Sequence, residues 1–345
     1  MKLLLKHTYL LAIVCAGQKT LAQKTETLHL LSHRVQISSS VFSNVEVIDN
    51  RINTESIGFI QRGAFNNKVA LALVQPMKDE ITSVANKLIE GANKQEGTLL
   101  INIRYFNISE VSKEVSEKGF FALNAGFYIK QGSDYRFLFS IDSTFAMKAG
   151  GLDVTSKLLD TIPEVLAGYI NQAAGFDLSK AGSKLYTADN IQHMSDVEKK
   201  EIPIYGIDIH KKGLYATYDD FKNNRPREDV FIENKKGFSR PFIHEMKANG
   251  KKGAEIKHKY YYVVCDGEKM FVSNAYGLYP LTKRDNDFYF IGVGKDEADV
   301  GTVVLAGALM GFAGGAAAAN NDLAQFEFRI DHATGNFIAI KKLKD

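Results

Sequence analysis

Residues 120–147 read FFALNAGFYIKQGSDYRFLFSIDSTFAM, and this stretch decides the fold of the first half of the chain. Apolar and aromatic residues dominate both of its arms, Phe120–Lys130 and Tyr135–Met147, which predicts two long strands. The four residues between the arms, Gln131–Asp134, include a glycine and suit a hairpin connection. The stretch therefore predicts a long antiparallel hairpin.

Shorter patterns surround this hairpin. Residues 99–106 alternate in the manner of a half-buried strand, and residues 28–35, 41–48, 57–61 and 68–74 have strand-like composition. Two helices are predicted from apolar residues at helical spacing, namely Met77, Ile81, Val84, Ala85 and Leu88 in residues 76–91, and Leu158, Ile162, Val165, Leu166, Tyr169 and Ile170 in residues 154–174. The prediction for residues 23–180 is an α+β domain, a two-layer antiparallel sheet with two amphipathic helices on one side.

Residues 181–202 are rich in polar and charged side chains, which predicts a linker. Strand patterns return in residues 203–345, so we expect a second, mostly antiparallel β domain. Asp266-Gly267 lies between two apolar runs and predicts a type I′ hairpin turn. A second hairpin is expected from Phe326–Ile330 and Phe337–Ile340.

The β domain is interrupted by Val300–Ala319, twenty residues without a charge. Gly307, Gly311 and Gly315 recur every four residues, so on a helix they form a helix-packing face without side chains. We expect an inserted Gly/Ala-rich helix that is buried or lies on a surface. The alternatives are self-association or membrane insertion through residues 300–319, and a single membrane span.

The N-terminus predicts export. Two lysines precede the apolar run Tyr9–Val14, and Thr20-Leu21-Ala22 resembles a cleavage site, so residues 1–22 read as a signal peptide with Gln23 as the mature start. Lipidation at Cys15 is the second choice, because valine precedes it. The mature chain then carries 40 basic and 40 acidic residues, which argues against a nucleic-acid partner. The expected location is extracytoplasmic, in the periplasm or at the outer membrane.

Two resemblances add to this pattern. Val45–Arg51 with Ile57-Gly58 downstream, followed by a helix, strands and a long final helix, resembles small envelope lipoproteins grouped with transport-auxiliary and outer-membrane assembly components. That resemblance implies a non-enzymatic periplasmic module that docks onto membrane machinery. In the second half, Gly213-Leu214-Tyr215 and Phe221–Pro226 are similar to secreted envelope proteins of uncharacterised function, and this likeness implies no activity.

No familiar catalytic or cofactor-binding motif is present in the sequence. A phosphate-binding loop, a nucleophile elbow and a zinc-protease motif are missing, and the one cysteine of the mature chain, Cys265, reads as a buried strand residue. His29 and His33 are expected to be exposed. The remaining candidates for chemistry meet only if the fold brings them together; they are His210, His244, His258, Asp208, Asp219, Asp220, Asp266 and Asp331.

The sequence therefore favours a non-enzymatic exported envelope protein that acts as an accessory or binding scaffold, with no catalytic residue, cofactor or metal assigned. Its expected partners are an envelope protein or a membrane surface. One alternative is an extracytoplasmic hydrolase whose acids and histidines converge in the fold. The other is an oligomeric, membrane-associated structural subunit built through the glycine-striped helix.

Overall fold

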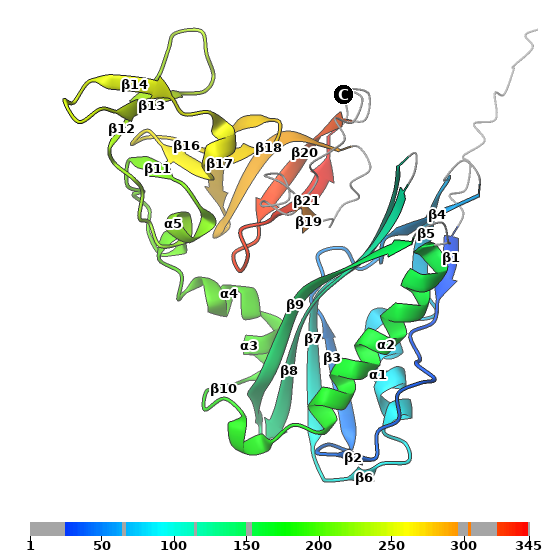
Figure 1. The fold of residues 1–345 in the computed structure, drawn as a ribbon. Helices are drawn as coiled ribbons and strands as arrows, with labels where there is room; N and C mark the ends of the chain where they lie inside the picture. Colours follow the sequence, from blue (N-terminus) through cyan, green and yellow to red (C-terminus); the bar gives the residue numbers. More distant parts are fainter. Residues whose placement is uncertain are drawn as a thin grey trace, which may run out of the picture.

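The computed structural model describes residues 25–63, 67–113, 116–149, 154–295, 303–304 and 323–343. These residues form two β-rich parts joined by short helices (Figure 1). Their buried side chains make two large cores, one drawn from Leu28–Ala181 and the other from Ile204–Ala339. Two smaller clusters lie beside them, one drawn from Leu214–Leu278 and one that joins Leu100 and Tyr128 to Ile191 and Met194. We call residues 25–186 the N-terminal unit and residues 203–343 the C-terminal unit. The predicted signal peptide, residues 1–22, lies outside the described residues.

The N-terminal unit is built on a five-stranded sheet in the order β10-β9-β8-β7-β3. Its three long strands are joined as hairpins, whereas β3 pairs with β7 in parallel. A smaller sheet has the order β1-β5-β4, and β2 pairs with β6. The strands are β1 (Thr25–Leu28), β2 (Ser39–Ser40), β3 (Asn44–Asp49), β4 (Phe59–Arg62), β5 (Asn67–Leu73), β6 (Asn93–Lys94), β7 (Thr98–Lys113), β8 (Ser116–Gln131), β9 (Asp134–Ala149) and β10 (Leu185–Tyr186).

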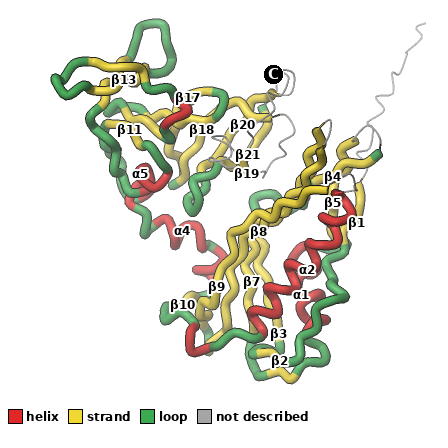
Figure 2. The backbone as a smooth tube through the Cα atoms, viewed as in Figure 1, coloured by secondary structure: helices red, strands yellow, loops and turns green. Residues whose placement is uncertain are grey.

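Helices α1 (Met77–Leu88) and α2 (Val154–Ala174) cover one face of the large sheet (Figure 2). The apolar positions predicted for α1 are all buried, and Leu158, Ile162, Leu166 and Ile170 of α2 are fully buried. They pack on inward-facing strand residues such as Ile101 and Phe121. Each such side chain contributes about 1.5–3 kcal/mol through burial. Neither α1 nor α2 covers the opposite face of the sheet. That face is therefore available to the connecting helices and the C-terminal unit.

Gly58 fixes the position of the small sheet against β7. It forms a parallel bridge with Ile108 and has φ of 109°, a value that side-chain-bearing residues rarely adopt. A Cβ atom at this position would lie 1.8 Å from the Ile108 carbonyl oxygen. Only glycine therefore allows the two backbones to meet at this point.

The segment between the units is short and largely structured. It contains α3 (Ala188–Gln192) and α4 (Met194–Lys199), with η1 (Leu178–Lys180) near the end of the N-terminal unit and η2 (Pro203–Tyr205) at the start of the C-terminal unit. Thr187 and Asn190 form a reciprocal capping box that starts α3. Residues 181–202, predicted as a linker, thus include β10 and the helices α3 and α4.

The C-terminal unit contains an eight-stranded sheet in the order β11-β15-β16-β17-β18-β20-β21-β19, and a three-stranded sheet in the order β12-β13-β14. The helix α5 (Tyr218–Lys222) packs on this unit's core through Phe221. The strands are β11 (Gly213–Tyr215), β12 (Val230–Glu233), β13 (Phe242–Met246), β14 (Lys252–Glu255), β15 (Val263–Cys265), β16 (Met270–Asn274), β17 (Gly277–Arg284), β18 (Asp287–Lys295), β19 (Val303–Val304), β20 (Leu323–Ile330) and β21 (Phe337–Lys342); η3 (His258–Tyr260) precedes β15.

The predicted fold class is wrong. Strands account for 45% and helices for 21% of the structure, and the described residues contain five α-helices and several sheets. The prediction of a two-layer α+β domain with two helices failed for two reasons. It missed the parallel pairing of β3 with β7 and of β1 with β5, which depend on contacts distant in sequence. The strand pair expected from residues 57–61 and 68–74 is present as β4 and β5. The prediction also missed α3 and α4, which are too short for a periodic pattern, whereas the helical turn expected within Tyr218–Pro226 is present as α5.

The Gly/Ala-rich stretch is described at two residues. Val303 and Val304 form β19, which pairs with Ile338 and Phe337 of β21. The helix predicted for 300–319 is therefore wrong at these two positions, where a sheet edge supplies the backbone partners. Gly307, Gly311 and Gly315 lie outside the described residues, so their role as a packing face stays a prediction. In the described ranges, no helix has the length and apolar character required to cross a membrane.

Candidate functional site

The site begins with the face of the large sheet that the two long helices leave uncovered. Side chains alternate across a strand, so while Ile103 and Ile108 face the helices, Tyr105, Asn107 and Ser109 lie on the other face of β7. The cross-strand partners of Tyr105 and Asn107 on β8 and β9 lie on the same face, so two rows of side chains run across the three strands. The rows are Tyr105–Asn124–Asp142 and Asn107–Ala122–Thr144. Polar and small side chains therefore form the floor of the site.

The roof is the turn between β20 and β21. Asp331 organises it, because its carboxylate accepts hydrogen bonds from the Thr334 hydroxyl at 2.6 Å and the Ala333 N–H at 3.3 Å. Gly335 has φ of 76°, and a Cβ there would lie 2.1 Å from the Tyr218 ring. The Tyr218 hydroxyl donates to the His332 carbonyl oxygen at 2.6 Å. The turn is thus held in one conformation against the C-terminal unit's core.

Floor and roof enclose a cavity of about 230 Å³. Its side wall is the loop after β3, including Asn50, Arg51 and Asn53. Residues of both units line it, since Asn107, Asn124 and Thr144 share it with Asp331, His332 and Thr334. Among the floor residues, Asn107, Ser109 and Thr144 make no side-chain hydrogen bond with another described residue.

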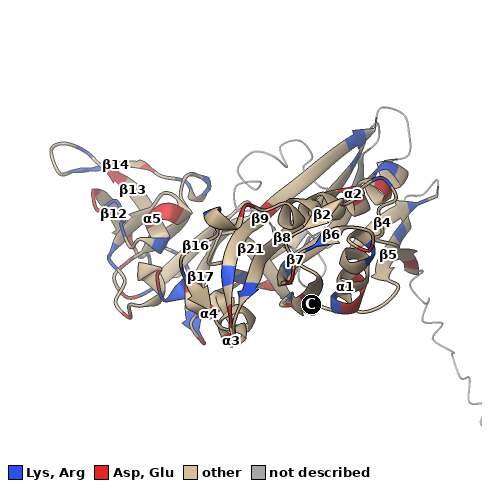
Figure 3. Cartoon of the chain, turned by 90° about the horizontal axis from the view of Figure 1, so that it is seen from below, with Lys and Arg blue, Asp and Glu red and all other residues tan. Residues whose placement is uncertain are grey.

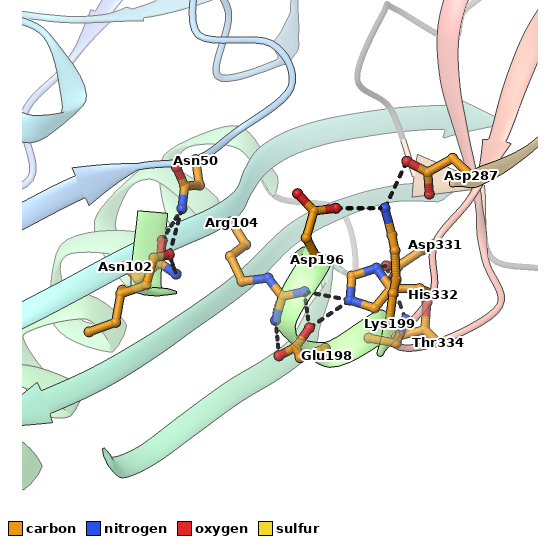
Figure 4. A network of polar contacts seen from close by, with 12 residues as sticks. Asn50, Asn102, Arg104, Asp196, Glu198, Lys199, Asp287, Asp331, His332 and Thr334 are labelled. Carbon is orange, nitrogen blue, oxygen red and sulfur yellow. Dashed lines mark hydrogen bonds and ion pairs between the residues drawn. The ribbon is translucent and has the colours of Figure 1, made fainter. Parts of the chain in front are cut away.

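An ion-pair network beside the cavity joins the two units (Figure 4). Arg104 of β7 donates to both carboxylate oxygens of Glu198 in α4, at 2.9 and 2.8 Å. The same carboxylate contacts Nε2 of His332 at 2.6 Å, so this nitrogen carries the proton and donates it. Sheet, connecting helix and roof turn therefore meet at one carboxylate.

Two opposing effects set the acidity of Glu198. Burial raises its pKa, but the hydrogen bond from His332 and the charge of Arg104 together outweigh burial and hold the pKa below its ordinary value. Glu198 is thus kept ionised. The imidazole of His332 is only 5% exposed, and the contact with Glu198 fixes its orientation.

Two further contacts fix the connecting helices. In α4, Lys199 is 4% exposed and its ammonium lies 2.8 Å from the carboxylate of Asp287, which is 9% exposed. In the N-terminal unit, Asn102 is fully buried and donates to the Ile191 carbonyl oxygen of α3 at 3.2 Å. Ile191 of α3 and Met194 of α4 are buried against Leu100 and Tyr128 of the sheet, so apolar packing and polar contacts together hold the connecting helices in place.

Asp142 is the accessible acid of the cavity. Desolvation within the cavity raises its pKa, and the nearby carboxylate of Asp331 raises it further. Arg104 opposes this shift, as does a hydrogen bond from Asn124. No group of three or more potential metal ligands occurs among the described residues.

The acids and histidines considered from sequence do not form one site. Asp331 lies at the cavity, whereas Asp208, His210 and Asp266 line a separate hollow on the C-terminal unit. Asp220 completes the capping box of α5, and Asp219 pairs with Arg225 at 2.7 Å. His29 and His33 are exposed, as predicted.

His244 is 12% exposed and lies 3.7 Å from a Glu233 oxygen. His258 has a pKa lowered by burial and by the charge of Arg240. Cys265 is 2% exposed and lies in β15, which confirms the prediction of a buried strand residue. Burial also raises the pKa of its thiol, which disfavours the thiolate.

Sequence reasoning missed Arg104, Asp142, Glu198 and His332. Glu198 was part of the charged linker, and His332 belonged to a predicted hairpin turn. The available signal was the interruption of the apolar pattern in β7 and β9 by arginine, asparagine and aspartate. Such an interruption marks a strand face that does not pack in a hydrophobic core.

No family model and no curated protein matches the chain. Among solved structures, it is similar to a Xanthomonas campestris protein assigned to family DUF330, with a TM-score of 0.28 and 17% identity over 44% of this chain and 93% of the other. It is also similar to a structure described as an uncharacterized protein, with a TM-score of 0.25 and 10% identity over 44% of this chain and 97% of the other. Likeness at this level carries no argument about function.

Proposed function

We propose that the chain is an exported envelope protein that acts by binding, and that the cavity between its units holds the ligand. The observation that carries this proposal is the cavity floor, where Asn107, Ser109 and Thr144 present amide and hydroxyl groups without a partner among the described residues. A few convergent polar groups in a concave site are the usual features of a ligand pocket.

The chemistry of the floor favours an uncharged, polar ligand. Amides and hydroxyls both donate and accept hydrogen bonds, so they match ligand groups of the same kind. Arg104 and Glu198 form an ion pair at the edge of the site, and His332 is hydrogen-bonded to the same carboxylate. Phe120 and Ile338 add apolar surface to the lining. A small molecule rich in hydroxyl or amide groups fits this combination.

Export rests on the sequence pattern of residues 1–22, and the accessory role rests on the resemblance of the first half to transport-auxiliary lipoproteins. The proposed partners are an envelope protein or a membrane surface. Self-association through residues 300–319 belongs to the same proposal, with Gly307, Gly311 and Gly315 as the contact.

A hydrolase is the second candidate, because Asp142, Asp331 and His332 line the same cavity. The contacts of these residues make it weaker than binding. His332 Nε2 is engaged by Glu198 at 2.6 Å, and Asp331 is engaged within its own turn. Asp142 alone is left accessible, whereas acid–base hydrolysis requires two groups with separate roles.

The test is native mass spectrometry of the full-length protein purified gently from its own envelope fraction. We expect a protein mass that begins at Gln23 and a non-covalent small-molecule adduct. Asn107→Leu should reduce adduct occupancy roughly tenfold, because a ligand polar group would lose its partner. The matched control is Asn171→Leu on the exposed side of α2, which should retain the adduct.

Three results would count against the proposal. A purified chain that still carries residues 1–22 would contradict export. Equal adduct levels in Asn107→Leu and Asn171→Leu would show that the ligand does not bind in the cavity. Conversion of the recovered compound into products by the wild type, abolished in Asp142→Asn, would establish the hydrolase instead.

A further inference from the structure

The small sheet β12-β13-β14 projects from the C-terminal unit on the side away from the N-terminal unit (Figure 1). Strand pairing places the loop 234–241 and the segment 256–261 at the same end of this sheet, because Glu233 pairs with Phe242 and the Ile256 N–H donates to the Ile243 carbonyl oxygen. We call these two stretches the sheet tip. It shares no residue with the cavity.

The sheet tip combines exposed aromatic rings with positive charge. Phe238 is 59% exposed and Tyr260 is 62% exposed, although large apolar side chains are normally buried. The two stretches contain no acid and five basic residues, which are Lys235, Lys236, Arg240, Lys257 and Lys259. Figure 3 shows lysine and arginine on the loops around this sheet. Acids are also close to the tip. Glu233 and Glu255 border it in sequence, and Asp208, Asp266 and Glu268 share a hollow with Phe238 and Arg240. Lys269 and Lys283 line the same hollow, so basic residues still outnumber acids around the tip.

Contacts within the loop hold this arrangement in place. Phe238 packs edge-on against Phe242, with ring centroids 5.0 Å apart. The Lys235 ammonium lies 4.4 Å from the centroid of the Phe242 ring, and the Arg240 guanidinium lies 5.7 Å from it. The Phe238 N–H donates to the Lys235 carbonyl oxygen at 3.1 Å, which closes a tight turn. Phe238 is therefore presented outward on an ordered loop.

We propose that the sheet tip docks onto an anionic phospholipid surface. An aromatic residue that enters the boundary between headgroups and acyl chains, surrounded by lysine and arginine that contact lipid phosphates, is the arrangement used by interfacial membrane-binding segments. The Lys235 ammonium is held over the Phe242 ring and lies 3.7 Å from a Glu233 oxygen, so the positive charge offered to headgroups comes mainly from the other basic residues of the tip. Long lysine side chains can place their charge at headgroups while their apolar stems stay close to the surface. Membrane docking rests on the proposed envelope role and specifies the surface involved. It depends on the residues of the sheet tip, whereas ligand binding depends on those of the cavity, so an experiment can contradict one proposal without contradicting the other.

The chain contains no tryptophan, which permits a direct test. Phe238→Trp places a single fluorescent reporter at the tip of the otherwise complete mature protein. We expect its emission to shift to shorter wavelength with vesicles containing phosphatidylglycerol, and to stay unchanged with pure phosphatidylcholine vesicles. The matched control is Val74→Trp, because Val74 is 57% exposed on the N-terminal unit, and this reporter should not respond.

Sedimentation with the same vesicles measures the affinity of unlabelled protein. Lys236→Gln and Lys257→Gln, at two exposed positions of the tip, should each weaken binding about fivefold, and high salt should weaken it further. Phe238→Ala should weaken it roughly tenfold. Lys251→Gln, in the loop at the opposite end of the sheet, should have little effect. The proposal is overturned if Phe238→Trp shows no spectral shift, if both vesicle types give the same shift, or if a soluble polyanion binds the tip while vesicles do not.

Discussion

Asp285 and Asn286 turn β17 into β18 with φ values of 49° and 59°. Asparagine and aspartate tolerate this left-handed region better than other side-chain-bearing residues, and two such residues in succession define a type I′ turn. The turn pairs Arg284 with Asp287 and so positions the carboxylate that meets Lys199. The conformation of this two-residue turn therefore sets the register of β17 and β18, and through it the position of the carboxylate that holds α4.

The type I′ turn predicted at Asp266-Gly267 is wrong. Four residues connect β15 to β16, and Gly267 has positive φ while Asp266 does not. Asp266 instead accepts the Lys269 N–H at 2.7 Å, which favours a longer loop. Asp-Gly is a stronger sequence signal for a type I′ turn than Asp-Asn. The turn at Asp285-Asn286 was therefore not predicted.

The turn at Asp285 gives a prediction for stability. Asp285→Val should destabilise the C-terminal unit by about 1–2 kcal/mol, because valine is strained at positive φ. Asp285→Gly should cost little, since glycine adopts this conformation freely. Urea unfolding of the two variants is the measurement. Equal stability of the two variants would show that the positive φ at residue 285 does not determine which residue is tolerated there.

At the scale of elements, α4 holds the molecule together although it is only six residues long. Glu198 connects it to β7 and to the roof turn, while the next residue, Lys199, connects it to β18. A helix this short gives no periodic apolar signal, so sequence patterns assigned it to a linker. The long elements behaved differently: α1, α2 and the β8–β9 hairpin were predicted correctly because their apolar positions repeat over many residues.

Glu198→Gln should destabilise the protein by about 1–2 kcal/mol at neutral pH, since a hydrogen-bonded charge is lost from a partly exposed site. The folded-state pKa of Glu198 is depressed, so its contribution is complete above the unfolded value near 4.5 and is lost as pH falls through the folded value. The difference between wild type and variant, measured by thermal unfolding, should therefore shrink below pH 4.5.

Glu201→Gln is the matched control, because Glu201 is 71% exposed and pairs with Lys184 on the surface. It should cost no more than about 0.5 kcal/mol. A cost equal to that of Glu198→Gln, or a Glu198→Gln effect that persists unchanged at pH 3, would contradict the role assigned to the network.

At the scale of the whole molecule, the candidate site is a product of topology. Its floor comes from alternate residues of three adjacent strands, and its roof comes from a turn more than 180 residues later in the chain. Neither part has a recognisable motif, so the sequence indicated the absence of standard catalytic patterns but not the location of the cavity. The cores of the two units, in contrast, follow from local apolar periodicity. Long-range placement depends on polar contacts such as Arg104–Glu198 and Asn102–Ile191, and on the packing of Ile191 and Met194 against the sheet.

The most direct test of binding between the units is hydrogen–deuterium exchange of the wild type, with and without the compound recovered in the native purification. The loop 50–56 and the turn 331–336 line the cavity from different units, so both should exchange more slowly when the compound is bound, while the loop 234–241 stays unchanged. Slower exchange in only one of the two cavity segments, or in neither, would contradict a ligand held between the units.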